Sequence, residues 1–505
     1  MSNSSDFKFD DLQGLLRYGH GKLTDTCFML LNIADADTAK QWLNTAPVSN
    51  STESDVPPDT ALQIAFSVEG LRALGLKKSV IEGFSDEFIT GMSGNENRSR
   101  RLGDIGANSP VHWGWGGNAE QVPHILLLLY AREKGIESWR KTVEGKGFSQ
   151  AFQLLSQLPT LHIGGIEPFG FKDGVSQPKI DWERRQSTDL HQRDRYSNIL
   201  ALGEVVLGYP NEYGLYTARP LIDPEKDRLA ADLPDAEEQP RLKDFGRNGT
   251  YIVLRQLAQD VPGFWQFLDK VSDAKADNRE QLAAVMVGRN RQGSPLETKA
   301  VEPIPGISSL DHDNHFTYDF DPEGKQCPIG AHIRRSNPRT GDLPPRVNGF
   351  FTRFKRILGF GSQDEDLVAS SRFHRLLRRG RSYGPELSPE DAIKPDALAA
   401  ERGLQFICLA ANILRQFEFV QNAWSMSSKF SGLQQESDPI LGNRKPLLSG
   451  ESTDQFNRPD PNGPVRKTCH LPQFVTVRGG AYFFMPGLSA LRYIAALPNK
   501  GGNHT

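Results

Sequence analysis

Short runs of apolar, β-branched and aromatic residues recur along the chain, and most lead into a stretch in which apolar positions have helical spacing. Apolar runs of this length between turn signals indicate strands, whereas a 3.6-residue period indicates helices. The expected strands are residues 26–33, 61–66, 124–130, 249–257 and 403–409, with a hairpin at 474–485 broken by Gly479-Gly480. The expected helices are residues 36–43, 68–76, 136–143 and 261–268 and a segment that runs through Phe417 and Trp424, with Ser67 as an N-cap.

The two halves of the chain share a faint internal repeat. The matching features are Phe28 and Trp42, 14 residues apart, Tyr251 and Trp265 at the same spacing, and the dipeptides Leu62-Gln63 and Leu404-Gln405. Duplication would give two similar antiparallel-sheet domains, and the pattern predicts the α+β fold class.

The likeliest domain boundary is a charged, proline-containing stretch at residues 223–248. It divides the chain into an N-terminal domain, 1–222, and a C-terminal domain, 249–505. Two further segments, 343–371 and 443–471, are predicted to be long insertions, which in compact proteins often cover a functional site.

Composition narrows the function classes. The 505 residues are 37% hydrophobic and 24% charged, as in soluble globular proteins. The formal charge of −3 does not favour nucleic acid or an acidic membrane as the main partner. Four scattered cysteines without a CxxC pair argue against a zinc ribbon, an iron–sulfur site and covalent c-type haem. With no signal-peptide pattern and no membrane-spanning run, we expect a cytoplasmic protein.

The segment CPIGAHIRRSNPR, from Cys327 to Arg339, carries the most specific chemistry. It places His332 in a turn bounded by glycine and proline and follows it with three arginines. Neutral imidazole binds iron, and guanidinium forms two-point contacts with carboxylates. Haem offers both an iron and two propionates. The alternative for this segment alone is a basic surface turn.

Two further segments carry polar groups in glycine-rich frames. EPFGFKDGVSQP, from Glu167 to Pro178, places Asp173 where glycines allow close ligand approach. RLLRRGRSYG, from Arg375 to Gly384, is an arginine cluster before a glycine stop. Taken singly, the first is typical of a common Asp-Gly turn and the second of solvated arginines at a helix end.

Together and in this order, the three segments resemble the motifs of the dye-decolourising peroxidase family, and the chain looks like one of its larger members. Supporting matches are DLQG at 11–14, GEVVLGYP at 203–210, NGTY at 248–251 and DPILG at 438–442. The resemblance implies two ferredoxin-like domains in tandem, of the dimeric α+β barrel superfamily. It also implies one haem b (iron protoporphyrin IX) per chain, held mainly by the C-terminal domain.

On the proximal side, the resemblance implies that His332 is the iron ligand. Arg339 would pair with a haem propionate, and Arg334 or Arg335 are further candidates for that role. Asp438 would accept the other imidazole N–H of His332 and so raise its basicity as a ligand.

On the distal side, Asp173 would move the peroxide proton as a general acid–base, and Arg378 would stabilise the charge that develops as the O–O bond breaks. Leu404 and Phe406 alternate along one strand and would form an apolar distal wall, with ordinary core packing as the alternative. Tyr383 matches a position that relatives use for surface electron transfer. Its alternative is simple packing beside the arginine turn.

The implied function is a haem peroxidase that reduces hydrogen peroxide through an oxyferryl intermediate and oxidises dyes, phenolics and other small aromatic reductants. A low-pKa carboxylate as proton carrier implies that acidic pH favours activity. The alternatives are a haem-binding carrier or storage protein and a protein that releases iron from haem. The Asp173–Arg378 pair argues against a carrier, whereas the 343–371 insertion leaves substrate range open.

Overall fold

The first half of the chain folds into four strands of one large sheet. They are β1 (Asp25–Ile33), β2 (Thr60–Phe66), β3 (Ile125–Ala131) and β4 (Phe152–Leu158), in the spatial order β2-β3-β1-β4. Every neighbouring pair is antiparallel. The helices that follow the strands are α1 (Ala36–Thr45), α2 (Val68–Ala73), α6 (Ile136–Glu144) and α7 (Phe148–Ala151). Ser67 caps α2 as predicted, since its hydroxyl accepts the Gly70 N–H at 3.2 Å.

The second half repeats this arrangement. Its strands are β10 (Thr250–Gln259), β11 (Leu377–Arg378), β12 (Arg381–Tyr383), β13 (Gly403–Ala410) and β16 (Val475–Met485), in the order β11-β13-β10-β16, with β12 also paired to β13. Helices α8 (Val261–Val271) and α9 (Ala276–Val287) follow β10, and the π-helices η11 (Leu414–Glu418) and η12 (Val420–Met426) follow β13. In each half, therefore, the first strand lies between the last two strands that this half contributes to the large sheet.

Of the two matches that indicated an internal repeat, only one occupies equivalent positions in the two halves. Phe28 on β1 and Trp42 on α1 correspond to Tyr251 on β10 and Trp265 on α8. The Leu-Gln dipeptides do not correspond, because β13 pairs with the first strand of its half, β10, whereas β2 pairs with β3 and not with β1.

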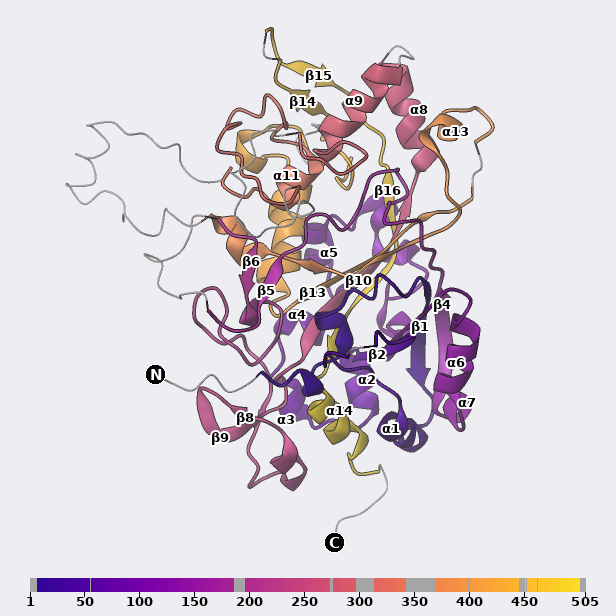
Figure 1. The fold of residues 1–505 in the computed structure, drawn as a ribbon, viewed down its shortest axis with the longest axis vertical. Coiled ribbons are helices and arrows are strands. Elements are labelled where there is room, and N and C mark those ends of the chain that lie inside the picture. Colours follow the sequence, from indigo (N-terminus) through magenta and orange to yellow (C-terminus); the bar gives the residue numbers. More distant parts are fainter. Residues whose placement is uncertain are drawn as a thin grey trace, which may run out of the picture.

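The two halves join into a single nine-stranded sheet where β16 meets β2, through the pair Phe484 and Phe66. The core on one face is shared: Met29 of β1, Val253 of β10 and Phe484 belong to the same buried cluster. Figure 1 shows the C-terminal helix α14 (Leu488–Ala495) at the same end of the molecule as α1, and the two helices are in contact.

The predicted hairpin at 474–485 is wrong, because this segment forms the continuous strand β16. Gly479 and Gly480 lie within the strand, where neighbouring side chains leave no room for a Cβ. A Cβ on Gly479 would lie 2.4 Å from the Trp115 ring, and one on Gly480 would lie 2.7 Å from the Met92 sulfur. The glycines therefore mark close packing rather than a turn.

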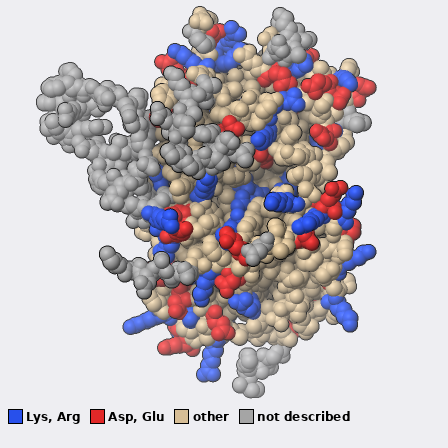
Figure 2. All heavy atoms as spheres, viewed as in Figure 1, with Lys and Arg blue, Asp and Glu red and all other residues tan. Residues whose placement is uncertain are grey.

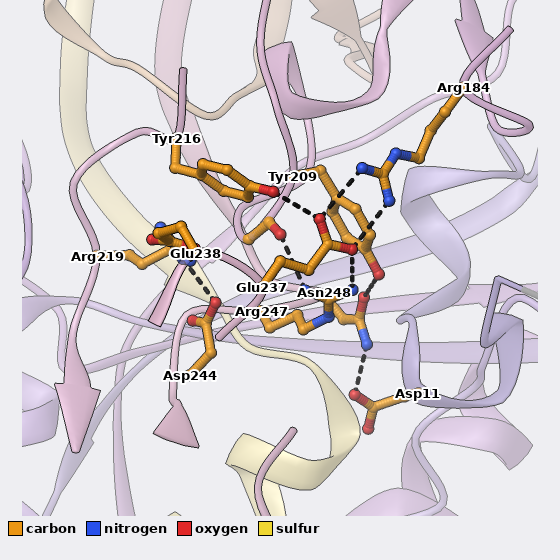
Figure 3. Close-up of polar contacts among 11 residues, drawn as sticks. Asp11, Arg184, Tyr209, Tyr216, Arg219, Glu237, Glu238, Asp244, Arg247 and Asn248 are labelled. Atoms are coloured by element: carbon orange, nitrogen blue, oxygen red, sulfur yellow. Dashed lines mark hydrogen bonds and ion pairs between the residues drawn. The ribbon is translucent and has the colours of Figure 1, made fainter. Parts of the chain in front are cut away.

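The stretch 223–248, expected to be a charged linker, contains ordered structure. It includes most of a small sheet, β7 (Leu221–Ile222), β8 (Asp235–Ala236) and β9 (Gln239–Asp244), in the order β7-β9-β8. Figure 3 shows Glu237 at the centre of its polar contacts. The Glu237 carboxylate accepts the Tyr216 hydroxyl at 2.7 Å and pairs with Arg184 and Arg247, both at 2.9 Å.

The structure describes residues 7–54, 56–185, 196–272, 276–296, 313–341, 369–397, 400–444, 450, 452–460 and 462–499. Most of the insertion predicted at 343–371 lies outside them. The insertion at 443–471 carries a hairpin of β14 (Phe456–Arg458) and β15 (Arg466–Thr468). Further α-helices and strands of the described residues are α3 (Lys78–Ile81), α4 (Asp86–Thr90), α5 (Glu96–Leu102), β5 (Lys179–Asp181), β6 (Ile199–Ala201), α11 (His332–Ser336) and α13 (Pro389–Ala392), and short 3-10 helices lie between them. Within the described ranges, no helix has the length and apolar character needed to cross a membrane.

Candidate active site

The three sequence motifs meet around one cavity. Its lining includes the predicted residues Asp173, His332, Arg339, Arg378, Leu404 and Phe406. They come from the loop after β4, from α11 and the turn after it, and from β11 and β13. Asp438 lies directly behind His332. The fold therefore brings together groups that are separated by more than 200 positions in the sequence.

Asp173 and Arg378 form an ion pair that faces the cavity. Nη1 of Arg378 lies 2.9 Å from Oδ1 of Asp173, and each side chain keeps about a third of its surface accessible, 33% and 36% respectively. Burial alone would raise the pKa of Asp173. The Arg378 guanidinium and the Gly174 N–H outweigh this effect and hold the pKa below its ordinary value.

Backbone contacts fix both partners of this pair. The Arg378 N–H donates to the side-chain oxygen of Gln177 at 3.1 Å, and the Gln177 amide donates to the Arg378 carbonyl at 3.2 Å. The Gly174 N–H donates to Oδ1 of Asp173 at 2.6 Å, and Gly174 has a φ of +81°, which favours glycine. The GxxDG spacing is thus a requirement of the turn that aims the carboxylate.

His332 stands at the start of α11, with its two ring nitrogens in different surroundings. Nδ1 lies 2.9 Å from Oδ2 of the fully buried Asp438. Burial would raise the pKa of Asp438, but His332 lowers it to about 2, so the carboxylate is ionised. Oδ1 of Asp438 accepts the N–H groups of Ile440 and Leu441, both at 2.9 Å. This arrangement leaves Nε2 of His332 as the ring nitrogen available to a ligand.

Three arginines line another part of the cavity. Arg339 donates to the carbonyls of Asn314 and Phe316 at 2.8 and 2.9 Å. Arg375 and Arg289 line the same cavity, and sequence reasoning assigned no role to either. Burial, followed by the charge of Arg339, lowers the pKa of Arg289 to about 10, and the three arginines bring positive charge to this part of the cavity. The outer surface in Figure 2 instead has acidic and basic side chains intermixed.

The prediction that Arg334 or Arg335 binds a propionate is wrong, since neither lines the cavity. Arg334 pairs with Asp321 at 3.1 Å and lies over the Tyr318 ring. Arg335 is fully buried and donates to backbone carbonyls, including that of Glu436 at 2.6 Å. Both arginines hold the turn that carries His332.

Tyr383 is not a surface aromatic residue. Only 2% of it is exposed, and its hydroxyl donates to Glu401 at 3.3 Å. Its ring approaches Gly403 so closely that a Cβ there would lie 2.9 Å away. The packing alternative therefore describes this tyrosine, and direct contact with a bulky donor is excluded in this conformation.

Comparisons with known proteins agree with the motifs. A multifunctional dye peroxidase of an Amycolatopsis species is 29% identical over 487 residues, covering 92% of this chain and 91% of its own length. Peroxidase 2 of Mycetinis scorodonius is 27% identical over 505 residues, covering 95% of this chain and 86% of its own length. A decolorizing peroxidase structure from Auricularia auricula-judae matches with a TM-score of 0.71 at 24% identity, over 97% of this chain and all of that one. The structure of a dye-decolorizing peroxidase in complex with 2,6-dimethoxyphenol matches with a TM-score of 0.69 at 23% identity, over 96% of this chain and 99% of that one. No protein-family model matches the chain.

Proposed function

Because this chain belongs to the dye-decolourising peroxidase family, we propose that it is a haem peroxidase that reduces hydrogen peroxide and oxidises dyes and phenolic donors. The observation that carries the proposal is one cavity with an Asp173–Arg378 pair and an Asp438-oriented His332 in its walls. Both reported sequence relatives are named as peroxidases, one of them as a dye peroxidase, and one structural relative is in complex with a phenol.

The cavity lining fits one haem b per chain. Nε2 of His332 can ligate iron because Asp438 engages Nδ1. Arg289, Arg339 and Arg375 supply guanidinium groups for the two propionates. When bound, haem supplies the iron at which peroxide is reduced and the conjugated ring that stores oxidising equivalents.

Asp173 and Arg378 have different roles in the reaction with peroxide. Asp173 is held ionised, so its carboxylate takes a proton from one peroxide oxygen and returns it to the other. Arg378 holds Asp173 in place and stabilises the negative charge that develops on the departing oxygen. Leu404 and Phe406, on the same face of β13, keep this part of the cavity apolar.

We propose that this proton transfer also operates at acidic pH. The lowered pKa of Asp173 keeps the carboxylate ionised, and therefore able to accept a proton, at pH values at which an ordinary aspartate begins to protonate.

We also propose that the fold consists of two ferredoxin-like domains, 1–222 and 249–505, joined by residues 223–248. The repeated strand order supports this division. The N-terminal domain contributes Asp173, and the C-terminal domain contributes His332 and Arg378.

An absorption spectrum of the haem-reconstituted protein tests the proposal. We expect a Soret band that changes within seconds of adding one equivalent of hydrogen peroxide and is restored by a phenolic donor. The absence of a Soret band would overturn the haem assignment. A band that peroxide leaves unchanged would instead indicate a haem carrier.

A further inference from the structure

A second carboxyl group, that of Glu167, faces the same cavity as Asp173. Its Oε2 accepts the Phe169 N–H at 3.0 Å and the side-chain amide of Gln259 at 2.8 Å. Its Oε1 accepts the Phe171 N–H at 3.0 Å. One side chain thus ties the turn before Asp173 to strand β10, which carries Gln259.

The backbone of Glu167 closes the same turn. Its N–H donates to the Phe171 carbonyl at 2.9 Å, and its carbonyl accepts the Gly170 N–H at 2.8 Å. Beyond the turn, the Asp173 N–H donates to the Gly165 carbonyl at 2.8 Å. The position of the Asp173 carboxylate therefore depends on Glu167 through a short, fully bonded loop.

We propose that Glu167 is a positioning residue for the peroxide step: its protonated carboxyl holds the turn that carries Asp173, and its ionisation slows the step. The inference rests on the peroxidase function proposed above. It adds a second proton-binding group to the distal part of the cavity.

The contacts of Glu167 leave room for a proton. Oε1 accepts only one N–H, so one of its lone pairs is available. A proton on Oε1 leaves the Gln259 amide donating to Oε2 at 2.8 Å.

Electrostatics favour the neutral acid over much of the acidic range. Burial raises the pKa of Glu167 to about 7, and the nearby charge of Asp173 acts in the same direction. Besides the Arg378–Asp173 pair, the charged groups that line this cavity include Lys172, the Arg255–Asp104 pair and His332, which pairs with Asp438. An ionised Glu167 would place a second negative charge where the departing peroxide oxygen also becomes negative.

The first test is the pH profile of the rate constant for reaction with peroxide in the holoenzyme. We expect the parent's rate constant to fall about tenfold per pH unit above pH 7, as for loss of one required proton. Glu167→Gln, which stays neutral, should show no such fall up to pH 8. The same fall in the variant, or an equal loss at every pH, would overturn the proposal, since the latter is what a purely structural role predicts.

A second variant tests the proposal independently, in case Glu167→Gln does not fold. Gln259→Met removes a donor that favours ionised Glu167, so the pKa of Glu167 should rise and the fall in rate should move to higher pH. If the rate constant of Gln259→Met falls over the same pH range as that of the parent, the proposal is contradicted.

Glu204→Gln is the matched control. Glu204 is a fully buried carboxyl whose pKa is also raised to about 7, but it pairs with Arg415 and does not line the cavity.

The haem-free protein gives a readout that does not depend on activity. A carboxyl whose pKa is raised from 4.5 to about 7 on folding stabilises the protein below pH 4.5, and this stabilisation is lost as the pH rises through 7. The urea midpoint of the parent should therefore fall relative to that of Glu167→Gln over this range. If this difference is present but peroxidase activity is absent, the proposed function fails while Glu167 still binds a proton. If the difference is absent, the inference itself fails.

Discussion

Arg378 and Arg379 are adjacent in the sequence, but their guanidinium groups have different surroundings. Arg378 reaches Asp173 in the cavity, whereas Arg379 donates to the Leu15 and Leu16 carbonyls at 2.9 and 3.3 Å. The side chains diverge because successive residues of an extended segment point to opposite sides.

Arg378→Leu should slow the reaction with peroxide by about 10²- to 10³-fold, since one charge-stabilising donor is lost at the point where charge develops. The Soret band should keep its position. Stopped-flow absorbance measures the rate, and Arg379→Leu is the control for loss of an arginine from the same strand region. An equal loss in both variants would show that Arg378 has no special role.

Asp438→Asn should weaken haem binding or slow the peroxide reaction by about 10- to 100-fold, because the imidazole loses an ionised partner that orients it. A haem titration and the peroxide rate constant measure the two effects. Asp454→Asn, at a 3.5 Å pair with the exposed His470, is the matched control. Wild-type values for Asp438→Asn would contradict the assignment.

At the residue scale, the sequence predicted which polar residues belong to the site, but not always where their side chains point. Asp173, His332 and Arg339 were predicted to face one site, and they do. Arg334 was misplaced because the turn that directs it inward depends on Asp321, which lies outside the motif. Arg289 carried no local signal at all, since only the folded chain brings it to the cavity.

At the scale of elements, the strands that sequence patterning predicted are those with little exposed surface. Every residue of β3 is buried, so its apolar run is unbroken. The strand β4 is an edge strand, and five of its seven residues are polar or partly exposed leucines in no regular order, which explains why patterning did not indicate it. Gly479-Gly480 indicated a turn because the Trp115 ring that requires the glycines comes from a distant segment.

The small β7-β9-β8 sheet should lose stability when Glu237 is changed to Gln. Burial would raise the pKa of Glu237, but Tyr216, Arg247 and Arg184 together lower it to about 2. The stabilisation of the fold by ionised Glu237 is therefore full above pH 4.5 and is lost as the pH falls towards 2. At pH 7 we expect a cost of about 1–3 kcal/mol in the free energy of unfolding, measured by urea denaturation.

The same measurement at pH 2.5 should show a much smaller difference between Glu237→Gln and the parent. Glu183→Gln is a suitable control, because Glu183 is mostly exposed and pairs with its exposed neighbour Arg185. A cost for Glu237→Gln that does not depend on pH would contradict the ionic account of this network.

At the scale of the whole molecule, the two halves share one sheet and one buried cluster, so we expect them to unfold together. Phe484 is fully buried at the junction, and its ring centroid lies 4.9 Å from that of Phe84. Phe484→Ala should cost about 3–5 kcal/mol through the cavity that it leaves. Tryptophan fluorescence and far-ultraviolet circular dichroism should report one shared, shifted transition. Two separate transitions would show that the halves are independent.

The central claim is that groups from both halves form one peroxide-reducing site, and the most direct test is the peroxide reaction of Asp173→Asn. This variant keeps the shape of the side chain and removes its ability to carry a proton. In stopped-flow mixing of the haem-loaded protein with hydrogen peroxide, we expect the rate constant to fall by at least about 10²-fold while the initial Soret band is unchanged. A rate constant equal to that of the parent would contradict the account.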